Sequence, residues 1–223
     1  FLEEIDILEN QSFPHQNINC MQIIEQKFNL VIPKNIKQIF KFGKKQFGDR
    51  MLKLLQTKKI ASIRWQALGM SELELSEISN YLKTICKNEV LILIENNIEL
   101  SVQLKLDGVH LTGGQKLVKK AKSILSKHQV IGAFCGSSKH SGLVAAENGA
   151  NYIAFKADYQ SVNTKGKYVE LFKWWSEFIE IPIMAECASD CLISGRIWKD
   201  CDFFSLSDNI WCSETSIEKY LQP

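Results

Sequence analysis

Long apolar runs are missing from this 223-residue sequence, and so is a marked excess of charge of either sign. No apolar stretch approaches the roughly 20 residues of a membrane-spanning helix, which argues against a membrane as partner. The formal net charge is only +2, from 27 Lys and Arg against 25 Asp and Glu, so nothing indicates nucleic acid as partner. Lysines do cluster at 41–46 and 116–127, where a solvated helix face is the simplest interpretation.

The sequence also lacks the cysteine and histidine patterns of metal sites and hydrolases. No Cys-x-x-Cys pair is present, and no Ser/His/Asp or Cys/His order stands out, so we assign no residue to a metal site or a hydrolytic triad. The cysteines are odd in number and scattered, which predicts reduced, mostly buried thiols of a cytoplasmic protein. They are Cys20, Cys86, Cys135, Cys187, Cys191, Cys201 and Cys212.

From residue 28 onward, short apolar runs alternate with amphipathic helical stretches. The runs are rich in β-branched residues and read as apolar on both faces, as expected for strands of a covered parallel sheet. Eight such strands are expected, at 28–33, 60–65, 90–96, 108–113, 129–136, 151–157, 181–187 and 202–208. Apolar residues at three- and four-residue spacing predict helices between them, at 35–57, 71–87, 115–127 and 138–150.

Eight strands, each followed by a helix or helical turn, predict an α/β fold: a single (β/α)8 TIM barrel over residues 28–223. An open doubly wound sheet is the alternative that the strand count leaves open. Residues 1–27 fall outside the rhythm and are expected to form a short N-terminal arm. Ser71 with Glu74 three positions later predicts a capping box at the start of one helix.

In such a barrel the chemistry lies on the loops at the carboxyl ends of the strands. Arg64 is the most informative residue there, because a guanidinium near the end of an apolar strand needs an anion or a carboxylate such as Glu95 on the neighbouring strand. Gly113 and Gly114 precede a helix, and so offer either backbone amides for an anion or a sharp turn. Lys165 lies in the segment NTKGK, which we interpret as a mobile loop that closes on phosphate or as an ordinary exposed loop. His110, in mid-strand, reads as a packed core residue.

Three segments resemble the thiamine phosphate synthase family, which includes the thiazole tautomerases. They are ENNIELSVQLKLDGVHLTGGQ (95–115), VIGAFCGSSKHSGLVAAENGANYIAF (130–155) and IPIMAECA (181–188). The resemblance spans about residues 28–221 and implies a TIM barrel. It also implies a reaction that joins hydroxymethylpyrimidine diphosphate to thiazole phosphate and releases pyrophosphate, with Mg²⁺, Arg and Lys neutralising the charge.

The resemblance assigns roles to residues at the strand ends. Arg64 matches the arginine of the family, and with Lys165 it is predicted to be catalytic, acting on diphosphate. The predicted substrate contacts are Gln66, Asn96, Asn97, Gly113, Gly114 and Ser137. A small phosphorylated ligand is the partner these residues imply, and association of the chain with itself is left open.

Several positions depart from the pattern of the family. Gln66 stands where a lysine is expected, and the metal carboxylates are replaced by amides in Glu95-Asn96-Asn97 and Thr112-Gly113-Gly114-Gln115. Strand alternation is expected to point Glu95 to the other face. Residues 185–188 replace the Gly-rich turn of the family and add the charge of Glu186. Asp208 adds a second negative charge. Two like charges ~4 Å apart repel by about 4 kcal/mol at an effective dielectric of 20. Phe134 and Gly136 replace the Ser/His pair of the tautomerases.

Three hypotheses follow. The first is a divergent thiamine phosphate synthase with weak or lost catalysis, in which Mg²⁺ follows only from the resemblance. The second is a non-catalytic barrel that binds another small ligand or a protein partner. The third is new chemistry in the old barrel, with Glu95, Glu186 or Asp208 as acid or base.

Overall fold

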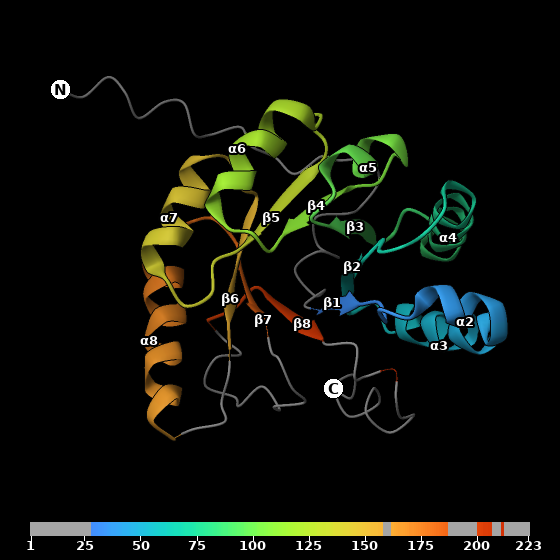
Figure 1. The fold of residues 1–223 in the computed structure, drawn as a ribbon. Helices are drawn as coiled ribbons and strands as arrows, with labels where there is room; N and C mark the ends of the chain where they lie inside the picture. The colour runs from blue at the N-terminus through green and yellow to red at the C-terminus, as the bar shows by residue number, and fades with distance from the viewer. Residues whose placement is uncertain (1–27, 158–161, 187–199, 207–210, 212–223) are drawn as a thin grey trace.

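The computed structural model describes residues 28–157, 162–186, 200–206 and Trp211. Within these ranges eight parallel strands pair in chain order, and the last pairs with the first, so the sheet closes into a barrel (Figure 1). The predicted (β/α)8 barrel is confirmed and the open sheet is excluded. The strands are β1 (Phe28–Val31), β2 (Ile60–Trp65), β3 (Leu91–Glu95), β4 (Gly108–Leu111), β5 (Val130–Phe134), β6 (Tyr152–Lys156), β7 (Ile183–Glu186) and β8 (Phe203–Leu206).

The helices lie outside the ring of strands (Figure 1). They are α2 (Ile36–Phe42), α3 (Lys44–Gln56), α4 (Glu72–Cys86), α5 (Ile98–Gln103), α6 (Gln115–Ile124), α7 (Lys139–Glu147) and α8 (Val162–Phe178). The single helix expected over 35–57 is therefore wrong, because Gly43, at φ −146° and ψ 21°, separates α2 from α3. The predicted arm, residues 1–27, lies outside the described residues.

Helix α4 begins with the predicted capping box. The Ser71 hydroxyl accepts from the Glu74 backbone N–H at 3.4 Å, and the Glu74 carboxylate accepts from the Ser71 N–H at 2.9 Å. Because each residue satisfies a backbone donor that the helix leaves free, this short motif alone sets where α4 starts.

Two apolar layers hold the barrel together. The larger lies between strands and helices, where Phe172 and Trp175 of α8 are fully buried. A smaller cluster fills the lumen and consists of Leu93, Val130, Tyr152, Ala154 and Met184. The expectation that all strands are apolar on both faces is wrong, since lumen positions also carry buried polar side chains. These are Asn29, Ser62, Arg64, His110 and Ser205.

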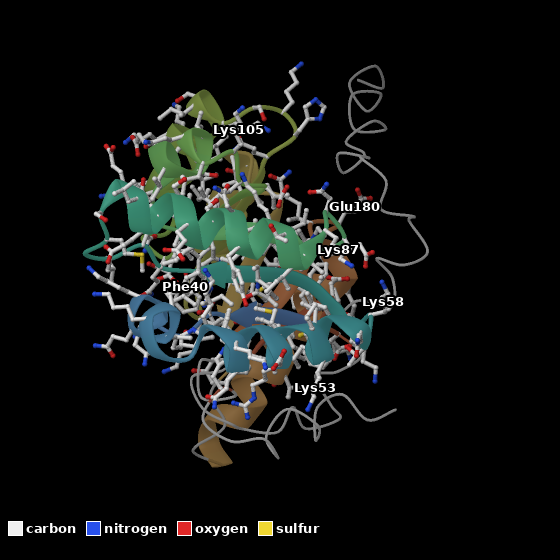
Figure 2. All side chains as sticks on the ribbon, turned by 90° about the vertical axis from the view of Figure 1, so that its right-hand side faces the viewer. Phe40, Lys53, Lys58, Lys87, Lys105 and Glu180 are labelled. Atoms are coloured by element: carbon white, nitrogen blue, oxygen red, sulfur yellow. The ribbon has the colours of Figure 1, made fainter. Side chains whose placement is uncertain are left out.

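The lysine-rich segments lie on the solvent side of the helical layer. The lysines of α6 are exposed, and the labelled Lys53, Lys58, Lys87 and Lys105 are exposed as well (Figure 2). The solvated-face interpretation of 116–127 is therefore confirmed. Within the described ranges, none of the helices has the length and apolar character needed to cross a bilayer.

Candidate functional site at the carboxyl end of the barrel

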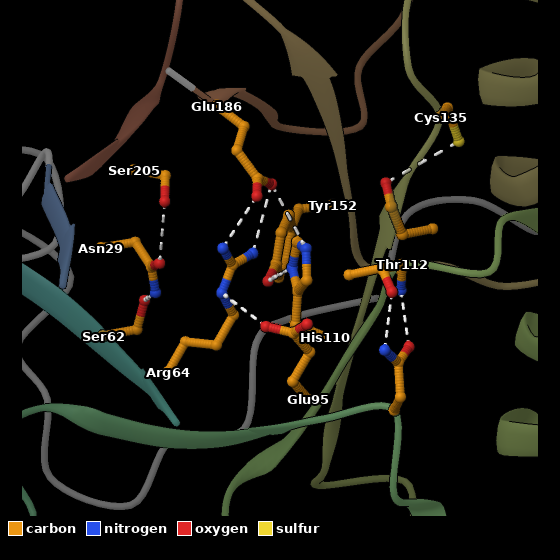
Figure 3. A network of polar contacts seen from close by, with 12 residues as sticks. Asn29, Ser62, Arg64, Glu95, His110, Thr112, Cys135, Tyr152, Glu186 and Ser205 are labelled. Atoms are coloured by element: carbon orange, nitrogen blue, oxygen red, sulfur yellow. Dashed lines mark hydrogen bonds and ion pairs between the residues drawn. The ribbon is translucent and has the colours of Figure 1, made fainter. Parts of the chain in front are cut away.

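A cluster of charged and polar side chains lies in the lumen near the carboxyl ends of the strands (Figure 3). It consists of Arg64 of β2, Glu95 of β3, His110 of β4 and Glu186 of β7, and Tyr152, the first residue of β6, contacts it through His110. They converge because successive residues of a strand point to opposite faces, and these occupy lumen-facing positions on staggered strands. In a TIM barrel this end carries the functional site.

Arg64 and Glu186 form a two-pronged ion pair across the lumen. The Arg64 Nη2 and Nη1 atoms lie 2.8 Å and 3.2 Å from Glu186 Oε1 and Oε2. Burial alone would lower the pKa of Arg64, but the charge of Glu186 and their hydrogen bonds raise it. Burial alone would raise the pKa of Glu186, but Arg64 holds it well below its usual range. Both groups are therefore charged at neutral pH.

The predicted pairing of Arg64 with Glu95 is confirmed only as the weaker contact, since Arg64 Nε lies 3.6 Å from Glu95 Oε2. Glu95 also accepts a hydrogen bond at 2.8 Å from the Gln66 amide. The expectation that Glu95 points to the other face is wrong. Asn96 has a left-handed backbone, φ 56°, and leaves the strand, so alternation from its position does not extend to Glu95.

His110 is buried, as expected, but both of its ring nitrogens face polar side chains of other strands. Its Nδ1 atom lies 2.7 Å from the Tyr152 hydroxyl, and its Nε2 atom lies 3.4 Å from Glu186 Oε2. Burial and the charge of Arg64 lower the pKa of His110, so the ring is neutral. Because Nε2 faces the carboxylate of Glu186, we assign the ring proton to Nε2, and Nδ1 then accepts from the hydroxyl of Tyr152, whose pKa burial raises.

The Tyr152 ring fits only because Gly132 of the neighbouring strand has no side chain. A Cβ at Gly132 would lie 2.0 Å from Tyr152 Cζ. Gly132 therefore leaves room for Tyr152, the hydrogen-bond partner of His110.

The predicted substrate contacts Asn96 and Asn97 hold the local backbone. The Asn96 amide accepts from the Thr112 N–H at 2.7 Å and donates to the Thr112 hydroxyl at 2.6 Å. Asn97 caps α5, with its side-chain oxygen accepting from the Leu100 N–H at 2.9 Å. Both side-chain oxygens therefore already accept a backbone hydrogen bond.

The remaining predicted contacts lie on the loops around the mouth. Gly114 precedes α6 with φ 73°, next to Gly113, and Ser137 is exposed in the turn after β5. The expectation that Lys165 lies in a loop is wrong, because this residue lies in the first turns of α8. Its side chain lies outside what the structure describes, as does Asp208.

The implied Mg²⁺ does not fit the donors that the structure describes. Mg²⁺ prefers at least one carboxylate together with phosphate. Asn96, where the resemblance expects a metal carboxylate, offers an amide oxygen that already accepts from Thr112. Among the described residues, no three His, Cys, Asp or Glu side chains group closely enough to hold a metal ion.

Sequence reasoning missed the role of Glu186 as the partner of Arg64, and the link from Tyr152 through His110. A usable signal was present, since all four residues occupy alternating positions of strands and would face one lumen. Alternation places side chains inside a barrel, but it does not say which of them meet across it.

Together, the closed parallel sheet, the surrounding helices and the polar cluster at the carboxyl ends define a TIM-barrel protein. Residues 31–187 match the family model described as thiamine monophosphate synthase. The chain belongs to this family, which confirms the resemblance and makes it a thiamine-phosphate-synthase-like protein.

Curated relatives agree with this assignment. A thiamine-phosphate synthase from Erythrobacter litoralis is 30% identical over 175 residues, covering 68% of this chain and 82% of the relative. One from Pelagibacter ubique is 30% identical over 196 residues, covering 79% and 91%. The fold is similar to that of a thiamine phosphate pyrophosphorylase from Pyrococcus furiosus, with a TM-score of 0.69, 17% identity, and coverage of 89% of this chain and 96% of the other.

Proposed function

We propose that this thiamine-phosphate-synthase-like barrel has weak or lost activity in the transfer reaction of its family. The observation that carries the proposal is the ion pair of Arg64 with Glu186, at 2.8 Å and 3.2 Å. Release of pyrophosphate needs positive charge at the leaving group. Here Glu186 already neutralises the predicted catalytic arginine.

For electrostatic reasons, a diphosphate is a poor replacement for Glu186 as the partner of Arg64. Like charges ~4 Å apart repel by about 4 kcal/mol at an effective dielectric of 20, so a phosphate beside Arg64 would also meet Glu186. The third nitrogen of the guanidinium faces Glu95 at 3.6 Å. The amides at the expected metal positions add no compensating charge, and the proposal assigns no step to Mg²⁺.

The alternative is a non-catalytic barrel that binds another small ligand or a protein partner. It is supported by the contrast between an apolar core that keeps the fold and charged side chains at the barrel mouth that pair with one another. New acid–base chemistry is disfavoured for Glu186, because its lowered pKa makes it a weak base with no proton to give at neutral pH.

We also propose a cytoplasmic location, supported by thiols suited to a reducing compartment. Cys86 and Cys135 are buried and free. Burial raises the pKa of Cys86 to about 12 and that of Cys135 to about 11, which keeps both thiols unreactive. The small net charge of the chain gives no reason to expect a partner of opposite charge.

The test has a binding part and a turnover part. Titration calorimetry of the purified protein with thiazole phosphate, and separately with pyrophosphate plus Mg²⁺, is expected to give no binding heat. An assay for pyrophosphate release from hydroxymethylpyrimidine diphosphate and thiazole phosphate is expected to stay near background. The thiamine-phosphate synthase of Pelagibacter ubique is the positive control in both. Micromolar binding of both ligands, weakened by Arg64→Ala, would contradict the proposal.

A further inference from the structure

The carboxylate of Glu186 lies where an anion bound to Arg64 would lie. Strands β2 and β7 are not neighbours in the barrel, so the two side chains meet across the lumen and not along a sheet edge. The two terminal nitrogens of Arg64 engage the two oxygens of one carboxylate, the same fork geometry with which a guanidinium holds a phosphate.

The two partners differ in how far they are open to solvent. The Arg64 side chain is 5% exposed and the Glu186 side chain is 21% exposed. Glu186 is therefore the more solvent-accessible partner, and because it occupies both terminal nitrogens of Arg64, an anion would have to replace it there.

Glu186 has a second buried neighbour besides Arg64. The His110 Nε2 atom lies 3.4 Å from its Oε2, and the ring is oriented by the Tyr152 hydroxyl at 2.7 Å from Nδ1. A carboxylate packed beside the buried ring of His110 loses less conformational entropy in binding Arg64 than a freely rotating surface glutamate would.

We infer that Glu186 is a specificity-determining residue, an internal carboxylate that occupies the anion position of Arg64 and excludes phosphate and pyrophosphate from the barrel. This inference rests on the proposed function, because it gives the reason why the leaving group of the family reaction is not accepted. It predicts that the anion site is blocked and not destroyed, so that removing one side chain opens it.

The test uses the full chain with Glu186→Gly, with inorganic pyrophosphate and inorganic phosphate as probes. Titration calorimetry is expected to show pyrophosphate binding at least about tenfold tighter in the variant than in the wild type, since a charge-assisted hydrogen bond is worth that much or more. Pyrophosphate is also expected to raise the melting temperature of the variant, and sodium chloride at equal ionic strength is not.

The matched control is the double variant Arg64→Ala with Glu186→Gly, in which the gain is expected to disappear. A gain that persists in the double variant would place the anion elsewhere and overturn the inference. A folded Glu186→Gly variant without any gain would overturn it too.

Glu186→Gln serves if the glycine variant fails to fold, because it keeps the shape and removes the charge. It is expected to bind pyrophosphate more tightly than the wild type, by a smaller factor, and binding equal to the wild type would overturn the inference. The outcomes also separate the two proposals. A wild type that binds pyrophosphate contradicts both, whereas a silent wild type with silent variants contradicts only the role of Glu186.

Discussion

At the amino-terminal end of the barrel one contact recurs three times, whereas at the carboxyl-terminal end charged side chains pair across the lumen. The residue before each of β4, β6 and β8 is Asp107, Asn151 and Asp202, and its side-chain oxygen accepts from an isoleucine N–H on the preceding strand. The distances are 2.7 Å, 2.8 Å and 2.8 Å. Each of the three also donates its own backbone N–H to the carbonyl of that isoleucine.

The carboxyl-terminal end has no such repeat among the described residues. Four side chains of different strands contact one another across the lumen, namely the guanidinium of Arg64, the carboxylates of Glu95 and Glu186 and the ring of His110 (Figure 3). A barrel is stabilised from its amino end and acquires its chemistry at the other. The polar side chains at the carboxyl end can therefore pair with one another while the repeated contacts that hold the strands in place stay intact.

The largest effect is expected from Arg64→Ala, which leaves the buried carboxylate of Glu186 without its partner. Removing one member of a buried pair costs about 3–5 kcal/mol. Urea denaturation would measure the free energy of unfolding. The control is Glu77→Ala, which removes an exposed pair with Lys44 and is expected to cost less than about 1 kcal/mol. Equal effects of the two variants would show that the carboxyl-end network is no stronger than a surface pair.

Next in size is Asp107→Ala at the opposite end, which leaves the Ile92 N–H without its acceptor. An unsatisfied buried donor costs about 1–3 kcal/mol. Asp107→Asn keeps an acceptor oxygen at the same place and is the matched control. If both variants unfold at the same urea concentration, the acceptor oxygen of residue 107 does not stabilise the fold.

A third effect is the pH dependence contributed by His110. Burial, followed by the charge of Arg64, lowers its pKa in the folded state, whereas the unfolded chain takes up the proton at about pH 6.5. Below that pH the unfolded state binds more protons, so the stability contributed by His110 falls as the pH drops from 7 to 5. His110→Gln is expected to flatten this slope. A wild-type slope that survives in His110→Gln would disprove the assignment.

The smallest effect is expected at Trp211, which ties the segment after β8 to the end of β1. Its indole N–H donates to the Val31 carbonyl at 2.7 Å, and its ring lies 5.1 Å from that of Phe47. Trp211→Phe keeps the ring contact and removes the hydrogen bond, at an expected cost of about 1 kcal/mol. Thermal unfolding followed by circular dichroism would detect it, and an unchanged melting temperature would rule out a contribution from this bond.

Much of the fold was predictable because it depends on local patterns. All eight strands lie within their predicted ranges, and Ser71 with Glu74 predicts the start of α4 correctly. The break at Gly43 and the helical position of Lys165 were not predicted, since glycine and polar residues are compatible with both helix and loop.

The site was less predictable, because it depends on contacts between distant parts of the chain. Arg64 was identified from the cost of burying its charge, and Glu186 from its departure from the family pattern. Their pairing joins residues on strands that are not neighbours, and no local pattern encodes which side chains meet across a lumen. The predicted orientation of Glu95 was wrong for a related reason, because the backbone of Asn96 turns where alternation assumes a continuing strand.

A double-mutant cycle between Arg64 and Glu186 tests the central claim most directly, namely that the carboxyl end of this barrel is closed by its own ion pair. The free energy of unfolding would be measured for the wild type, Arg64→Ala, Glu186→Ala and the double variant. We predict a favourable coupling energy between about 1 and 3 kcal/mol, as contacting charged residues show. Additivity within about 0.5 kcal/mol would contradict the account, because Arg64 would then be free to receive an anion.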